Sequence, residues 1–269
     1  MTIRWSLCIS LSLFNAVSGW AQGADRHAGL KASAVFSVGP TANVRKEMAA
    51  WPKITSPRTP AVDRANAIIA AMNQSTLDAL RNCDDLYRGS LGLPNSARVK
   101  ADWLRRITVT MHGPRFVAMV ATETSFCGGA YPLNDHAAMV FDMTTGELVN
   151  WQKFFAAVDG AAAEPEKAKD GATSSEIVAP VLTNLALERA EGPECKRALE
   201  DFGELVFQVW PDARRGQLML KATGQPHVTQ ACEDTIGLSL PKARKLGISK
   251  EVLDAIEQAH RINTSSPKR

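Results

Sequence analysis

Residues 106–122, with the sequence RITVTMHGPRFVAMVAT, decide the fold. Over residues 106–111 polar and apolar side chains alternate, which is the pattern of a strand with one buried face. Residues 112–114, His-Gly-Pro, predict a turn. Residues 116–122 form a second apolar run of strand length. The stretch therefore predicts an antiparallel hairpin.

Helices and further strands are expected on both sides of this hairpin. Thr59 and Pro60 are typical of a helix start, with threonine as the N-cap and proline at the first helical position. The spacing of apolar residues extends this helix over 60–84. We expect further strands at 137–143, 205–210, 217–221 and 235–240, a helical turn at 151–155, and helices that begin at 175 and 249. The grouping predicts an α+β fold, an antiparallel sheet with helices packed on it, in one domain over residues 59–265.

The N-terminus has the pattern of a secretory signal peptide. Arg4 precedes an uncharged, mostly apolar run, and the small residues Gly19 and Ala21 stand at −3 and −1 of a cleavage site before Gln22. The apolar run is shorter than the roughly 20 residues that span a bilayer. We expect a signal peptide over 1–21, an extension or linker over 22–58, no membrane span after cleavage, and a periplasmic or secreted product.

Charge and composition exclude some classes of protein. Cleavage removes one of the 31 basic residues and none of the 28 acidic ones, so the remaining chain is nearly neutral. Nucleic-acid binding usually requires a clustered basic face, and the sequence has no basic block. We therefore expect no nucleic-acid partner. The histidines and cysteines have no metal-ligand spacing, so we expect neither a metal nor another cofactor.

Four cysteines follow the signal peptide: Cys83, Cys127, Cys195 and Cys232. An even number in an exported protein favours disulfides over metal binding or catalysis. Four cysteines allow three connectivities. We favour Cys83–Cys127 and Cys195–Cys232, since each pair flanks one run of predicted structure. Each bond would close a loop of about 40 residues and contribute roughly 4 kcal/mol on the chain-entropy model.

Residues 122–136 join two predicted strands and hold most of the polar side chains that a site would need. Glycines there permit unusual backbone conformations, and a tyrosine offers a large amphipathic recognition surface. Glu123 and His136 would form an acid–base pair if they met in space. The alternative is that the segment is only a constrained connection between strands. The candidate binding residues are Gly128, Gly129, Tyr131, Asn134 and His136, and the weak catalytic candidates are Glu123 and His136.

The segment 128–132, the turn Asp142-x-x-Thr145-Gly146 and the short helix at 151–155 together resemble the RsiV-like C-terminal domain of unknown function. That domain occurs in the extracellular part of a lysozyme-sensing anti-sigma factor and beside some peptidoglycan deacetylase domains. The resemblance covers residues 106–240 and implies an envelope location with a lysozyme-like protein or a peptidoglycan fragment as partner. Tyr131 stands where the family has histidine, and the cysteines are not part of its pattern.

Three functions remain open on these grounds. The first is an exported binding module of the bacterial envelope that recognises a lysozyme-like protein or a cell-wall fragment. The second is an envelope hydrolase that uses Glu123 and His136, with Ser125 as a further candidate. The third is a structural envelope protein without a small-molecule site. No motif names a reaction, so the sequence leaves enzymatic activity undecided and leans against it.

Overall fold

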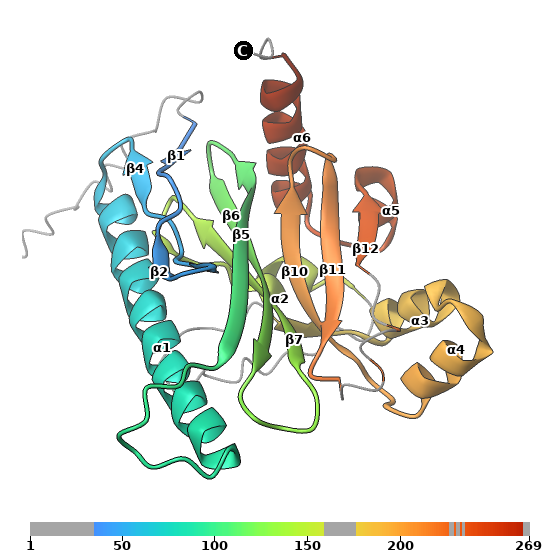
Figure 1. Ribbon diagram of the computed structural model, residues 1–269. Helices are drawn as coiled ribbons and strands as arrows, with labels where there is room; N and C mark the ends of the chain where they lie inside the picture. Colours follow the sequence, from blue (N-terminus) through green and yellow to red (C-terminus); the bar gives the residue numbers. More distant parts are fainter. Residues whose placement is uncertain (1–34, 159–175, 226–228, 230–231, 233–234, 266–269) are drawn as a thin grey trace, which may run out of the picture. The chain divides into compact units, whose positions relative to one another are not determined.

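The structure, a computed structural model, describes residues 35–158, 176–225, 229, 232 and 235–265. The expected signal peptide and the residues that follow it up to 34 lie outside this range. The described part combines a six-stranded, a four-stranded and a two-stranded sheet with six helices. The expected α+β fold with antiparallel sheets is confirmed (Figure 1).

The six-stranded sheet has the strand order β2-β3-β5-β6-β7-β8. Its strands are β2 (Asn43–Arg45), β3 (Met48–Ala49), β5 (Asp102–His112), β6 (Phe116–Phe126), β7 (Leu133–Asp142) and β8 (Glu147–Leu148). The predicted hairpin is β5–β6, paired from Asp102↔Phe126 to His112↔Val117. Every neighbouring pair is antiparallel except β3 and β5, which meet in parallel at Met48 and Arg105.

The four-stranded sheet has the order β12-β11-β10-β9, with β9 (Glu176–Val178), β10 (Val206–Asp212), β11 (Gln217–Thr223) and β12 (Ile236–Ser239). The expected helix start at Ser175 and Glu176 is wrong, because residues 176–178 pair with β10 as β9. The helix α3 (Pro180–Arg189) begins only at Pro180, which occupies its first turn. Proline is well suited to that position because the first amides of a helix have no intrahelical partner.

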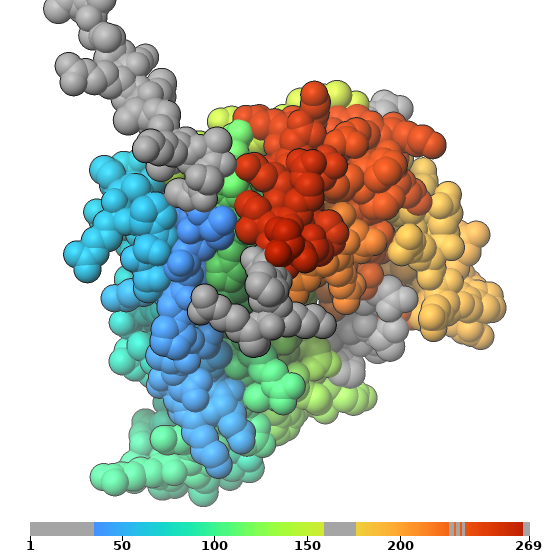
Figure 2. All heavy atoms as spheres, turned by 90° about the horizontal axis from the view of Figure 1, so that it is seen from above, coloured from blue at the N-terminus to red at the C-terminus, as the bar shows by residue number. Residues whose placement is uncertain are grey.

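The segment 22–58, expected as an extension or linker, contains packed structure from Phe36 onward. It holds β1 (Ser37–Val38) and β4 (Ile54–Ser56), which form the two-stranded sheet, as well as β2 and β3. Phe36, Trp51 and Ile54 are buried in the same core as the start of α1 (Pro60–Ser90). Figure 2 shows this segment, in blue, beside the first turns of α1, in cyan.

The helix α1 begins as the sequence predicts. The Thr59 side chain accepts a hydrogen bond from the Val62 amide, and Pro60 follows directly. The helix continues to Ser90, six residues beyond the predicted end at 84. The other helices are α2 (Trp151–Phe155), α4 (Gly192–Glu200), α5 (Leu240–Lys245) and α6 (Lys250–Ser265). The sequence predicted α2 and α6 but missed α4 and α5.

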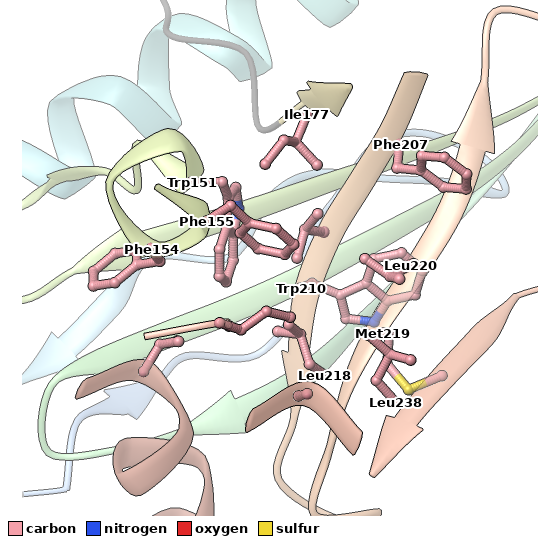
Figure 3. Packing of buried hydrophobic residues seen from close by; sticks show 14 of the residues in the cluster. Trp151, Phe154, Phe155, Ile177, Phe207, Trp210, Leu218, Met219, Leu220 and Leu238 are labelled. Carbon is pink, nitrogen blue, oxygen red and sulfur yellow. The ribbon is translucent and has the colours of Figure 1, made fainter. Parts of the chain in front are cut away.

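Two hydrophobic cores cover the two faces of the six-stranded sheet. On one face, Val62, Ala65 and Ile69 of α1 pack with Met119 and Phe141 of the sheet. On the other face, the larger core combines residues of the four-stranded sheet with residues of α2, α3 and α6. Figure 3 shows Phe155 of α2 pointing toward the side chains of β10, whereas Phe154 points away from them. In the buried part of β6 and β7, side chains therefore alternate between the core that contains α1 and the core that contains the second sheet.

Both favoured disulfides are present. Cys83 bonds to Cys127, which ties α1 to the end of β6. Cys195 of α4 bonds to Cys232. The sequence separations of 44 and 37 residues match the expected loops of about 40 residues. The Cys83–Cys127 bond anchors residues 122–136, the candidate functional segment of the sequence analysis, to α1.

Candidate functional site

The candidate segment runs from the end of β6, through a loop, to the start of β7. The Cys83–Cys127 disulfide holds the beginning of this loop against α1. Gly128 follows with a φ of +91°, and a Cβ there would collide with the side chain of Ser90 in the last turn of α1. Gly128 is therefore required by backbone conformation and by close packing. Gly129 has neither constraint, since a Cβ there would meet only the Tyr131 carbonyl at 3.9 Å.

Large apolar side chains are exposed around this loop. Tyr131, on the β6–β7 connection, is 64% exposed, and Leu133, the first residue of β7, is 58% exposed. Within the described residues, six of the seven exposed large hydrophobic side chains belong to α1's last turns, the following loop, the start of β5, the β6–β7 connection or the start of β7. We call five of these the loop-end surface: Leu86, Leu91, Leu93, Tyr131 and Leu133. Leu104 pairs with Thr124 and therefore lies on the sheet face opposite Leu133, which pairs with Ser125. In Figure 1 the end of α1 and the β6–β7 loop lie at the same end of the fold.

A groove of about 450 Å³ adjoins the loop-end surface. Trp103 and Leu104 of β5, Phe126 of β6 and Pro132 of the loop contribute its apolar lining. Exposed apolar patches with a neighbouring groove are typical of surfaces that bind a partner. The loop-end surface and this groove are the part of the candidate segment that is best suited to binding.

Asn134 lies at the start of β7 beside this surface. It pairs with Thr124 of β6, and the Thr124 hydroxyl donates a hydrogen bond of 3.0 Å to the Asn134 side-chain oxygen. The same strand pair places Leu133 opposite Ser125. Gly129, Tyr131 and Asn134 thus lie within one short stretch of exposed chain.

Glu123 and His136 do not meet. The register of β6 and β7 pairs Thr122 with His136 and Glu123 with Asp135. Side chains of directly paired residues share a face, and successive residues alternate between faces. Glu123 therefore projects toward α1 while His136 projects toward the second sheet. Ser125 lies on the same face as Glu123, so it does not meet His136 either.

Glu123 is part of a buried ion pair. Its carboxylate lies 2.9 Å from the Nε of Arg105 and accepts a 3.0 Å hydrogen bond from the Trp103 indole. Arg105 also donates to the Thr76 hydroxyl of α1 and lies over the Trp51 ring. Burial raises the pKa of Glu123, although Arg105 and Trp103 act in the opposite direction. These contacts join α1, β5 and β6, and they engage the carboxylate that a general base would need.

His136 is only 8% exposed, so it does not belong to the loop-end surface. Its ring lies 4.6 Å from that of Trp210 on β10. The pKa of His136 is lowered to about 4, mainly by burial and also by the positive charge of Lys221, whereas Gln208 and Asp135 oppose the change. The imidazole is therefore neutral near pH 7. It lines a cavity of about 240 Å³ between the start of β7 and the end of β11.

Sequence reasoning missed the leucines of the loop-end surface. Leu86, Leu91 and Leu93 lie beyond the predicted end of the first helix, where no periodic pattern shows which side is exposed.

Within the described residues, no group of three or more His, Cys, Asp or Glu side chains is arranged to hold a metal ion. Among the described helices, none combines the length and apolar character that crossing a membrane requires.

No protein-family model matches this chain, and no curated protein matches it. Solved structures similar to it include a DUF3298 family protein from Pseudomonas aeruginosa PAO1, with 15% identity and a TM-score of 0.33. That match covers 59% of this chain and 66% of the other, slightly less than two thirds of its length. A DUF3298 family member from Bacteroides fragilis NCTC 9343 has 9% identity and a TM-score of 0.45, covering 84% of this chain and 98% of the other. The structural neighbours are thus DUF3298 family proteins, whose function is unknown, and the resemblance to the RsiV-like domain stays a prediction.

Proposed function

We propose that this protein is an exported binding module that uses the loop-end surface to bind a lysozyme-like protein. The observation that carries the proposal is the gathering of exposed apolar side chains around a loop fixed by the Cys83–Cys127 disulfide. A fixed loop loses little conformational entropy on binding, so more of the contact energy contributes to affinity. Tyr131 is the expected anchor, because tyrosine combines a large apolar area with a polar tip.

Export is supported by the N-terminal pattern of the sequence and by the two disulfides. Disulfides persist in the periplasm and outside the cell, and they are rare in the reducing cytosol. A lysozyme-like partner comes from the resemblance of residues 128–132 and 142–146 to the RsiV-like domain. A cell-wall fragment is the alternative ligand that the same resemblance implies.

The acid–base geometry that a hydrolase would need is not supported at this segment. Glu123 and His136 occupy opposite faces of the sheet, and the Glu123 carboxylate is engaged by Arg105 and Trp103. The binding proposal needs neither residue as a catalyst.

Titration calorimetry of the chain from residue 22 onward tests the proposal. One titration uses a c-type lysozyme, and the other uses a disaccharide-tetrapeptide muropeptide. We expect lysozyme binding, and we expect Tyr131→Ala to weaken it by about 2 kcal/mol, or about 30-fold, as for an anchor at the centre of an interface. Phe202→Ala is the matched control, because Phe202 is 40% exposed and lies just beyond α4, outside the loop-end surface. Equal losses in the two variants, or no binding of lysozyme, would contradict the proposal, and binding of the muropeptide alone would favour the alternative ligand.

A further inference from the structure

A second cavity lies away from the loop-end surface. It has a volume of about 740 Å³ and opens between α1, the β7–β8 turn, α2 and the start of α6. Volumes of about 300–1,000 Å³ are typical of sites for small ligands. None of the candidate residues from the sequence lines this cavity.

One wall of the cavity is a stripe of α1. Ile68, Ala71, Met72 and Ser75 line it, at the i, i+3, i+4 and i+7 spacing that places residues on one side of a helix. The strand β8 is only two residues long and pairs only with Phe141 and Asp142. The sheet is therefore short at this edge, and it leaves the stripe uncovered by strands.

The rest of the lining combines apolar side chains with an arginine that is held by two ion pairs. Leu148 and Phe154 supply apolar surface, and Phe154 packs edge-on against Phe116. Arg115 lies 2.8 Å from Asp142 and pairs with Glu251 of α6. Burial disfavours the charged guanidinium, but its bonds to the two carboxylates outweigh this and raise the pKa of Arg115. Arg115 is thus fully engaged by the protein itself.

Two further charged side chains line the cavity and, unlike Arg115, are not engaged in ion pairs within the described residues. Glu147 and Lys153 are exposed and both line the cavity. Neither forms an ion pair with any residue in the described part of the chain. The lining therefore offers a carboxylate and an ammonium group of opposite charge beside apolar side chains.

We propose that this cavity binds a short peptide with free ends and at least one apolar side chain. The apolar side chain packs against Met72 and Phe154, the peptide's ammonium group pairs with Glu147, and its carboxylate pairs with Lys153. A free peptide carries both charges near pH 7, since its α-amino pKa is about 8 and its α-carboxyl pKa about 3.5. This site is separate from the loop-end surface and does not depend on the proposed lysozyme binding.

The experiment is titration calorimetry of the chain from residue 22 onward with the tripeptide alanyl-leucyl-alanine, and with its N-acetylated and C-amidated forms. We expect the free tripeptide to bind with a Kd below about 1 mM and each capped form to bind about three- to fivefold more weakly, as for exposed ion pairs. Lys153→Met should weaken the free form but leave the amidated form unchanged. Glu147→Gln should weaken binding of the free form but leave binding of the acetylated form unchanged.

A matched pair of helix variants locates the site. Ala71→Phe places a ring in the cavity and should abolish binding, whereas Ala70→Phe adds the same ring at a neighbouring exposed position that does not line the cavity. Equal melting temperatures of the two variants show that Ala71→Phe does not act by unfolding. The proposal is overturned if the free tripeptide does not bind, if capping both ends has no effect, or if the two variants bind equally well.

Discussion

The burial of His136 makes the protein sensitive to acid in a defined pH range. In the unfolded chain histidine has a pKa of 6.5, whereas in the folded protein burial lowers the pKa of His136 to about 4. Above pH 6.5 the side chain is neutral in both states. Between pH 6.5 and about 4 the unfolded chain binds a proton that the folded protein does not, so stability falls as the pH falls. Below about pH 4 both states are protonated and the loss is complete.

The size of the effect follows from the two pKa values. Each tenfold change in proton affinity corresponds to about 1.4 kcal/mol, so the fall from 6.5 to about 4 amounts to about 3 kcal/mol. Domains are usually stable by only about 5–15 kcal/mol, so this loss is a large share of the total. Lys221, which pairs across the sheet with Gln208, increases the effect, and Asp135 beside His136 reduces it.

The assay is urea unfolding, followed by tryptophan fluorescence, of the wild type and of His136→Phe at several pH values. Phenylalanine keeps a ring against Trp210 but does not titrate. Other groups titrate equally in both proteins, so their effects cancel in the difference. We expect the wild type to lose about 3 kcal/mol more than the variant between about pH 7 and about pH 4. Parallel pH profiles would refute this reasoning, as would an NMR titration that gives His136 a pKa near 6.5.

Three further changes test how the candidate segment is held. Gly128→Ala should lower the free energy of unfolding by about 1–3 kcal/mol because of its positive φ, whereas Gly129→Ala should have little effect; urea unfolding measures both. Glu123→Gln should cost about 3 kcal/mol, because it leaves a buried arginine without its partner, and thermal unfolding would show no change if the pair were unimportant. Replacing both Cys83 and Cys127 by alanine should cost roughly 4 kcal/mol in non-reducing buffer, and a difference that persists after reduction of both proteins would contradict a disulfide origin.

The elements that the sequence predicted well are those with a long, regular pattern. The alternation over 106–111, the turn at 112–114 and the apolar run at 116–122 predicted β5–β6. The burial of β5 partly alternates along the strand, whereas β6 is buried on both faces from Phe116 to Ala121. Thr59 and Pro60 predicted the start of α1 through capping. The strands between residues 37 and 56 are two or three residues long, and such short strands have no periodicity to detect.

The sequence did not predict on which face of the sheet Glu123 and His136 lie, because this depends on the register between β6 and β7. Glu123 and His136 are close along a hairpin, but a shift of one residue in pairing moves a side chain to the other face of the sheet. The sequence contains no feature that fixes the pairing of Thr122 with His136. Tyr131 and Asn134 became candidates because their segment joins two predicted strands and combines glycines with polar side chains, and their role in binding stays a prediction. The cavity beside α1 was missed because its lining comes from segments far apart in the chain.

Hydrogen exchange of the chain from residue 22 onward, with and without saturating c-type lysozyme, tests the central claim most directly. We predict slower exchange of the amides at residues 127–133 and 86–93, the two segments that supply the loop-end surface. The amides of α4, which carries the other disulfide, should exchange at the same rate in both samples. Unchanged exchange at 127–133, or protection confined to α4, would contradict the assignment of the loop-end surface as the binding surface.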